Sequence, residues 1–163
     1  MARENKKIVS KLSHVEIVHD NPQAAADFMR DMFGAVQVEK QWSGWLAKTF
    51  QIECIHMMFG EIVYQILKPS PALPSWEKLL KEVGPSVHNM SIQVNGADKF
   101  RAALKARGVE EVHAWKGAID FKAAGYDVEG PPRDAFFFDA TRECGLRFEF
   151  IESLPEWEPG EQE

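Results

Sequence analysis

VHNMSIQV at residues 87–94, followed by ADKFRAALKARG at residues 97–108, restarts an order of elements that is present earlier in the chain, and this repeat indicates the fold class. The first segment has the pattern of a strand, and the second predicts a helix closed by Gly108. Three further strands are predicted in VEEVHAW, AFFFDA and LRFEFIE. The second half of the chain is therefore expected to run strand, helix and three strands.

The first half of the chain shows the same order. LSHVEIV at residues 12–18 alternates as a strand does, and a helix is expected from about Gln23 to Met32, begun by Asp20-Asn21-Pro22 and ended by Gly34. AVQVEKQW, FQIECIHMMF and IVYQILKP predict three strands, the last two joined by a tight hairpin at Gly60-Glu61. Because an error would have to occur twice at the same place, the repeat is stronger evidence than any single element.

The repeat predicts one α+β domain over residues 1–163, built from two βαβββ modules that form a half-open barrel. The modules are expected at about 9–68 and 87–152. A linker at 69–86 joins them, and an acidic tail at 153–163 follows.

Two connecting segments have patterns of their own. In the linker, SWEKLLKEV predicts a short helix that Ser75 caps and Gly84 stops. The stretch from Lys116 to Arg133 contains glycines and prolines with no sustained period, so it is expected to be a loop. Loops of this length often act as lids or binding loops, and the alternative is a disordered excursion.

Composition narrows the class of protein. With 45% hydrophobic and 27% charged residues, the 163-residue chain is typical of soluble globular proteins, and its net charge of −6 argues against nucleic-acid binding. Cys54 and Cys144 have no metal-binding or disulfide spacing. The first residues are too charged for a signal peptide, and no apolar run is long enough to span a membrane. A cytoplasmic location is expected.

Strand alternation predicts which side chains converge inside the barrel. In the first strand His14, Glu16 and Val18 share one face, whereas Val15 and Ile17 suit packing under the helix. His14 is therefore expected to point into the cavity.

The hairpin and the last strand add further polar residues. A two-residue turn at Gly60-Glu61 places His56 opposite Gln65 on the same face. Glu149 lies between two phenylalanines, so its carboxylate is expected to face away from their rings.

One imidazole, one amide oxygen and one carboxylate form a ligand set for a divalent Co, Mn, Fe, Ni or Zn ion. His14, Gln65 and Glu149 are the candidate ligands. Taken singly, each residue has an ordinary alternative as a hydrogen-bonded structural histidine or a polar residue at a sheet edge. Only their symmetric arrangement favours a metal site.

Four pieces in order carry a family resemblance: LSHVEIV, YQILKP with Gln65 four residues before the proline, the linker helix before GPSVHNMSIQV, and GLRFEFIE. From about Val9 to Glu152 the chain resembles the vicinal oxygen chelate superfamily, which includes glyoxalases, bleomycin resistance proteins and dioxygenases, and within it the methylmalonyl-CoA epimerases. The resemblance implies a glyoxalase-like fold, a homodimer, and a divalent metal bound by one residue at each of four places.

The fourth of these places departs from the family pattern, which often has two adjacent histidines there. Aligning the strand through its apolar face (Met90, Ile92 and Val94) puts Asn89 in the cavity and turns His88 outward or toward the rim. Three alternatives follow: Asn89 supplies an amide oxygen, a bulge turns His88 inward, or the metal is bound weakly.

The resemblance implies a metal-dependent isomerase or epimerase. The metal polarises a carbonyl oxygen, a base takes the adjacent proton, and the enolate at the metal is reprotonated. Glu149, Glu16 and His56 are the candidate bases, and strand parity disfavours Glu53. A carbonyl compound is the expected substrate, and an acyl-CoA is implied by the resemblance alone.

Aromatic and methionine residues near the cavity strands suit a bulky substrate, although most such residues pack in cores. They are Trp42, Trp45, Phe50, Met57, Met58, Trp115 and Phe121. Two other functions are alternatives: a lyase or Fe²⁺-dependent dioxygenase on the same scaffold, or a non-enzymatic protein that binds small molecules.

Overall fold

The computed structural model describes residues 10–38, 41–94, 96–119 and 133–152. The first module contains β1 (Ser10–Val18), α1 (Pro22–Phe33), β2 (Val36–Gln37), α2 (Gln41–Phe50), β3 (Glu53–Phe59) and β4 (Ile62–Lys68). The linker helix is α3 (Pro74–Val83). The second module contains β5 (Ser86–Val94), α4 (Ala97–Ala106), β6 (Glu110–Ile119), β7 (Arg133–Ala140), α5 (Thr141–Cys144) and β8 (Leu146–Glu152).

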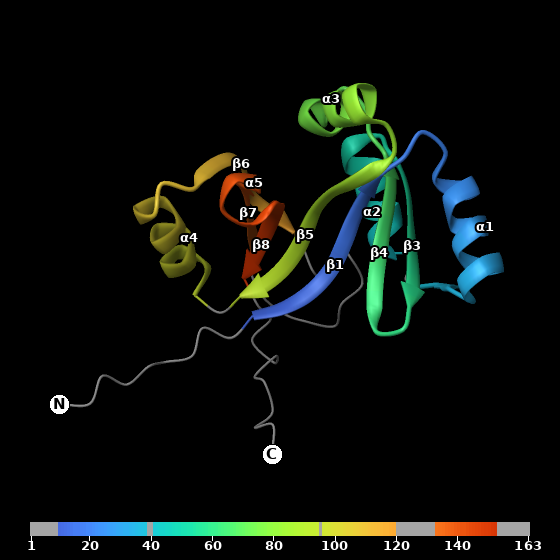
Figure 1. Ribbon diagram of the computed structural model, residues 1–163, viewed down its shortest axis with the longest axis horizontal. Coiled ribbons are helices and arrows are strands. Elements are labelled where there is room, and N and C mark those ends of the chain that lie inside the picture. Colours follow the sequence, from blue (N-terminus) through green and yellow to red (C-terminus); the bar gives the residue numbers. More distant parts are fainter. Residues whose placement is uncertain (1–9, 39–40, 95, 120–132, 153–163) are drawn as a thin grey trace, which may run out of the picture.

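The strands form one curved eight-stranded sheet in the order β2-β3-β4-β1-β5-β8-β7-β6 (Figure 1). At its centre β1 and β5 pair antiparallel, and each also pairs in parallel with the last strand of its own module. Counted outward from the centre, the two modules therefore repeat the same strand order. The sheet ends at β2 and β6, so the barrel is half-open and the predicted α+β fold is confirmed.

Helix α1 and the β3–β4 hairpin form where local sequence signals predicted them. Asn21 caps α1 by accepting a hydrogen bond from the Ala24 N–H, and Gly34 ends the helix in the left-handed conformation at a φ of 67°. In the β3–β4 hairpin Gly60 has a φ of 60°, and the register pairs His56 with Gln65 as predicted.

Three sequence-based expectations are wrong. AVQVEKQW is a strand only at Val36–Gln37, because the chain then forms α2, whose Leu46 packs in the core of the sheet's inner face. Helix α3 begins at Pro74, so Ser75 lies inside the helix and does not cap it. Strand β6 continues to Ile119 through the first residues of the expected loop, whose remaining part, 120–132, lies outside the described residues.

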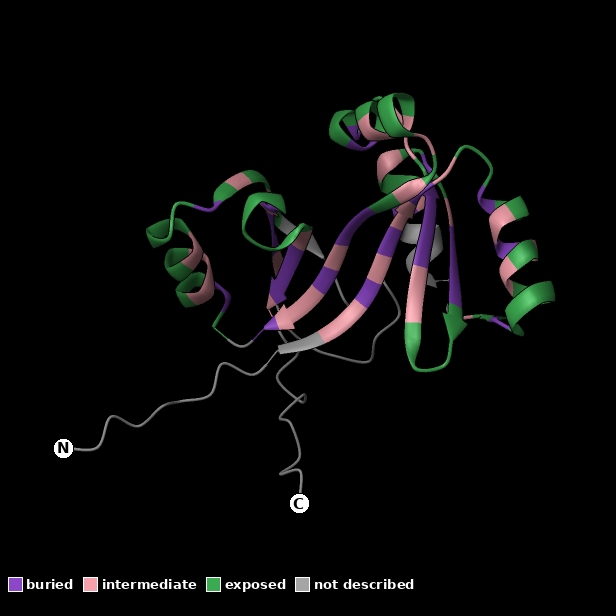
Figure 2. Ribbon diagram, viewed as in Figure 1, coloured by how far each residue is buried: buried purple, intermediate pink, exposed green. Residues whose placement is uncertain are grey.

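Helices cover both faces of the sheet. On the outer face α1 packs over Ile55, Met57 and Ile66. Helix α4 packs over Phe136, Phe138 and Phe150 of β7 and β8. On the inner face α2 and α3 pack against Val18, Leu67, Ile151 and their neighbours. Burial runs along the central strands (Figure 2). No helix among the described residues has the length and apolar character that crossing a bilayer requires.

Candidate functional site

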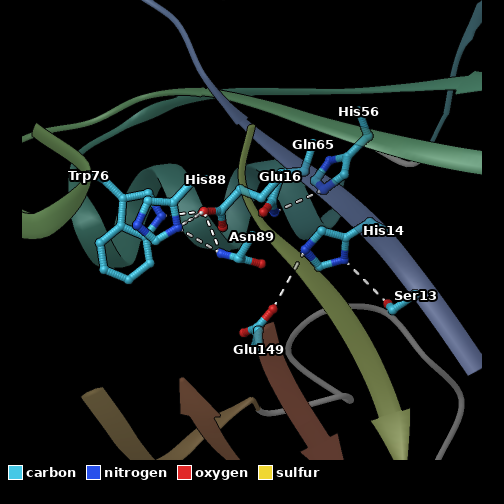
Figure 3. Close-up of polar contacts among 9 residues, drawn as sticks. All are labelled: Ser13, His14, Glu16, His56, Gln65, Trp76, His88, Asn89 and Glu149. Atoms are coloured by element: carbon cyan, nitrogen blue, oxygen red, sulfur yellow. Dashed lines mark hydrogen bonds and ion pairs between the residues drawn. The ribbon is translucent and has the colours of Figure 1, made fainter. Parts of the chain in front are cut away.

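Polar residues gather on the inner face of the central strands, in the midst of this apolar core. His14 and Glu16 lie on β1, with the buried Val18 next on the same face, as strand alternation predicted. His14 Nε2 lies 3.7 Å from Glu149 Oε2, and Gln65 on β4 lies within hydrogen-bonding reach of His14 (Figure 3). The fold therefore brings together the three residues that the sequence predicted as neighbours.

Burial keeps both imidazoles of this cluster neutral. It lowers the pKa of His14 to about 3, with the neighbouring His56 adding to the shift and Gln65 opposing it. Burial likewise lowers the pKa of His56 to about 4. His14 Nδ1 faces the Ser13 hydroxyl at 3.3 Å, which leaves Nε2 directed at Glu149, and Gln65 Nε2 lies 3.1 Å from His56 Nε2.

The pKa of Glu149 is shifted in the opposite direction, upward. Burial raises its pKa to about 8, the negative charge of Glu16 adds to the effect, and the Ser91 hydroxyl opposes it. At neutral pH the carboxyl group therefore holds its proton. Its contact with His14 joins a carboxylic acid to a neutral imidazole, although the distance alone would fit an ion pair.

Glu16 contacts three side chains from two elements, α3 and β5. Its Oε1 accepts hydrogen bonds from Trp76 Nε1 on α3 and from Asn89 Nδ2 on β5, the latter at 2.8 Å. His88 Nδ1 lies 3.2 Å from the same oxygen, and the His88 ring stacks on Trp76 with centroids 4.2 Å apart. Glu16 thus connects the linker helix to the centre of the sheet (Figure 3).

A β-bulge explains why both His88 and Asn89 are buried. Glu16 pairs with Asn89 whereas Ile17 pairs with Val87, so His88 is an extra residue in β5. The bulge interrupts the alternation of the strand, and His88 turns inward against Trp76. The expectation that His88 points outward or to the rim is therefore wrong, whereas Asn89 is buried as expected.

Asn89 has a feature that could serve a bound ion. Its Oδ1 is buried and has no hydrogen-bond partner among the described residues, and Figure 3 shows it on the side where His14 and Glu149 meet. In the described ranges no group of three or more His, Cys, Asp or Glu side chains could hold a metal. A metal here needs amide oxygens from Gln65 and Asn89 beside His14 and Glu149, and that mixed set fits a divalent ion.

Comparison with solved structures identifies the fold. It is the fold of methylmalonyl-CoA epimerases. The epimerase from Mycobacterium tuberculosis matches with a TM-score of 0.61, 19% identity, and coverage of 88% of each chain. A Streptomyces coelicolor epimerase in complex with 2-nitronate-propionyl-CoA matches with a TM-score of 0.56, 16% identity, and coverage of 88% of this chain and 96% of that one.

A hypothetical protein from Bacillus halodurans also matches, with a TM-score of 0.62, 17% identity, and coverage of 91% of this chain and 98% of that one. No protein-family model and no curated protein matches the sequence. Identities this low show the fold of the methylmalonyl-CoA epimerases and do not assign an activity.

The bulky residues expected near the cavity are divided between the two faces of this epimerase-like sheet. Phe50 and Trp115 stack in the inner core with centroids 4.9 Å apart. Met57 packs under α1 on the outer face and Met58 is partly exposed, so that expectation is wrong for both methionines. The side chains of Trp42 and Trp45, and the whole of Phe121, lie outside the described residues. Glu53 is exposed on β3.

Trp76 is the site residue that sequence reasoning missed, because it lies in the linker helix rather than on a barrel strand. A cavity of about 260 Å³ opens beside it, lined by residues of α3 and the second module. Among the lining residues are Leu79, His88, His113, Phe137 and Arg147. His14 and Glu149 are absent from that lining, so the cavity lies apart from their contact.

Trp76→Phe should lower the free energy of unfolding by about 1–3 kcal/mol, because the buried Glu16 carboxylate loses a donor while most of the ring remains. Urea unfolding measures this change. Trp115→Phe is the matched control, since Trp115 stacks in the same core. Equal losses in the two variants would show that the indole N–H adds nothing beyond packing.

Proposed function

We propose that this chain is a metal-dependent isomerase or epimerase that moves a proton on the carbon next to a carbonyl group. The observation that carries the proposal is the buried contact of His14 Nε2 with Glu149 Oε2 at 3.7 Å, with Gln65 beside it. Burial raises the pKa of Glu149 to about 8 in the metal-free protein, and binding of a divalent ion to the carboxylate would lower it again. The epimerase fold of the solved relatives supports the same reaction class.

In this proposal His14, Gln65 and Glu149 hold one divalent ion, with Asn89 Oδ1 as the fourth ligand. The bound ion supplies Lewis-acid polarisation of the substrate carbonyl. The Ser13 contact orients the imidazole, since it occupies Nδ1 and leaves Nε2 free of that partner. His88 is not proposed as a ligand, because it stacks on Trp76 and contacts Glu16.

Glu149 is proposed to carry the proton. Its burial excludes water from the carboxyl group, and Glu149 pairs in the sheet register with Ser91 on the neighbouring strand. His56 and Glu16 are the rival bases. His56 is neutral and within reach of Gln65, whereas Glu16 already accepts hydrogen bonds from two donors.

The proposed substrate is a carbonyl compound, and an acyl-CoA is the first to test. Support for an acyl-CoA comes from the epimerases solved with methylmalonyl-CoA and with 2-nitronate-propionyl-CoA. A cytoplasmic location and one domain spanning residues 1–163 complete the proposal.

Two measurements test the proposal together. Elemental analysis of protein purified without chelator should find close to one divalent ion per chain, and NMR should detect deuterium uptake from solvent into an acyl-CoA next to its carbonyl. Uptake without metal would refute the metal dependence. Metal without uptake into any carbonyl compound would favour the lyase or dioxygenase, and the absence of both would favour a binding protein.

Asn89→His should raise the affinity for Zn²⁺ or Ni²⁺ by about 10-fold or more, because an imidazole replaces an amide oxygen beside the other ligands. Calorimetric titration of the chelator-treated protein gives the dissociation constant. His113→Asn serves as a control outside the proposed ligand set. An affinity unchanged by Asn89→His would show that residue 89 does not face the ion.

A further inference from the structure

The cavity of about 260 Å³ beside Trp76 is a second place where a small molecule can bind. Its lining residues come from α3, β5, β6, β7 and β8, and none of the four proposed metal ligands is among them. Arg147 lines the cavity and lies two residues before Glu149 on the same face of β8. The cavity therefore lies farther along the inner face of the sheet than the proposed metal site.

One wall of the cavity is aromatic and apolar. Trp76 of α3 meets Phe137 of β7 nearly edge to face, with centroids 5.4 Å apart, and His113 of β6 lies 5.9 Å from Phe137. Burial lowers the pKa of His113, so its ring is neutral at neutral pH. Leu79 and Val112 add aliphatic surface. A wall of this composition suits a flat, apolar ring.

His88 brings a polar atom to the same cavity, although only 7% of the residue is exposed. Its Nδ1 lies 3.2 Å from Glu16 Oε1 and 2.9 Å from Asn89 Nδ2 (Figure 3). Within the described ranges His88 makes no polar contact through Nε2, which is therefore the nitrogen available to a molecule in the cavity. A buried polar atom of this kind gains free energy when a ligand or water supplies its partner.

Arg147 is the cation of the lining whose donors are not all used. Its Nε donates to Asp139 Oδ2 at 3.1 Å, and its two terminal nitrogens make no polar contact with another described residue. Asp139 Oδ1 accepts hydrogen bonds from the Thr141 N–H and hydroxyl, so this carboxylate is fully engaged and holds the guanidinium in place. Lys78, by contrast, pairs with Glu82 at 4.0 Å, and both side chains are exposed. The terminal N–H groups of Arg147 are suited to a carboxylate.

The size of the cavity limits the ligand further. Pockets for drug-sized molecules measure about 300–1,000 Å³, so 260 Å³ fits a molecule with one ring and is too small for an acyl-CoA. We infer that the cavity binds a small aromatic carboxylate, with its carboxylate on Arg147 and its ring against Trp76 and Phe137. The inference is independent of the proposed reaction.

Calorimetric titration of the full chain with benzoate tests the inference. One benzoate should bind per chain, with the same affinity before and after treatment with chelator, because no proposed metal ligand lines the cavity. Benzamide, which has the same shape without the charge, should bind at least about 10-fold more weakly. Acetate should also bind at least about 10-fold more weakly, because it lacks the ring.

Two variants locate the bound benzoate. Arg147→Gln should weaken binding at least about 10-fold, whereas the matched control Arg142→Gln, at an exposed position of α5 outside the lining, should leave it unchanged. Leu79→Trp should also weaken binding, because the larger side chain fills the cavity. Circular dichroism shows whether each variant is folded. In NMR spectra of wild type, benzoate should shift the indole N–H signal of Trp76, which Trp76→Phe identifies.

Three results would overturn the inference. The first is the absence of saturable benzoate binding up to its solubility limit. The second is equal affinity in folded Arg147→Gln and Arg142→Gln, or equal affinity of wild type for benzoate and benzamide, because the carboxylate would then not lie on Arg147. The third is binding that chelator abolishes, which would place benzoate at a metal ion. The proposed reaction is judged separately, by deuterium uptake and metal content.

Discussion

Glu149→Gln should lower deuterium exchange into a carbonyl substrate by about 10²- to 10⁴-fold, the usual size of a general acid–base contribution. The amide keeps an oxygen near the position of the carboxylate but cannot take up a proton at neutral pH. Metal content should therefore fall less than the exchange rate. Exchange is followed by NMR, and metal content by elemental analysis of the same preparation.

Two comparison variants identify the proton carrier. His56→Ala and Glu16→Gln each remove a rival base without changing a proposed ligand. If Glu149→Gln exchanges almost normally while one of them does not, Glu149 is only a ligand. Normal exchange in all three variants would show that none of these residues takes the proton.

Local rules explain most of what the sequence predicted. Helix α1 and the β3–β4 hairpin depend on Asn21, Gly34 and Gly60, whose effects act within a few residues. Helix α2 was missed because the segment QWSGWLAKTF has no recognisable cap and contains a glycine in its interior. Its stability depends on contacts with the inner core, and those are formed by residues distant in the sequence.

The candidate site also contains residues that local rules predicted and residues that they did not. His14, Gln65 and Glu149 were predicted to converge because strand parity and the hairpin register determine which face a side chain occupies. Parity failed at His88, since a bulge shifts the register by one residue without a glycine to mark it. The adjacent polar residues His88 and Asn89, in a strand whose other residues are mostly apolar, were the sequence signal that could have indicated the bulge.

Trp76 could not be predicted as a partner of Glu16. Sixty residues separate the two in the sequence, and their contact depends on where the linker helix packs against the inner face of the sheet. Periodicity shows only that the helix buries one side. The residues of the sheet that this side meets are determined by the assembled fold.

In the metal-free protein, ionisation of Glu149 should lower stability as the pH rises from about 4.5 to 8, and Glu149→Gln should remove that contribution. Because burial raises the pKa of Glu149 from 4.5 to about 8, the folded chain binds more protons than the unfolded chain between these values. The contribution of Glu149 to the free energy of unfolding is therefore most favourable below pH 4.5 and becomes less favourable as the pH rises to 8. One pKa unit corresponds to about 1.4 kcal/mol, so the decline is on the order of a few kcal/mol.

His14 and His56 act in the opposite direction, since burial lowers their pKa values to about 3 and about 4 and stability falls as the pH drops below 6.5. Urea unfolding at successive pH values in chelator should therefore give nearly equal stabilities for wild type and Glu149→Gln at pH 4.5, and a more stable variant at pH 8. Glu111→Gln is the matched control with the opposite sign, because Arg101 lowers the pKa of Glu111 to about 2. Parallel pH curves for wild type and Glu149→Gln would show that the carboxyl group ionises normally. A divalent ion that binds this carboxylate should restore wild-type stability at pH 8 and leave Glu149→Gln less affected.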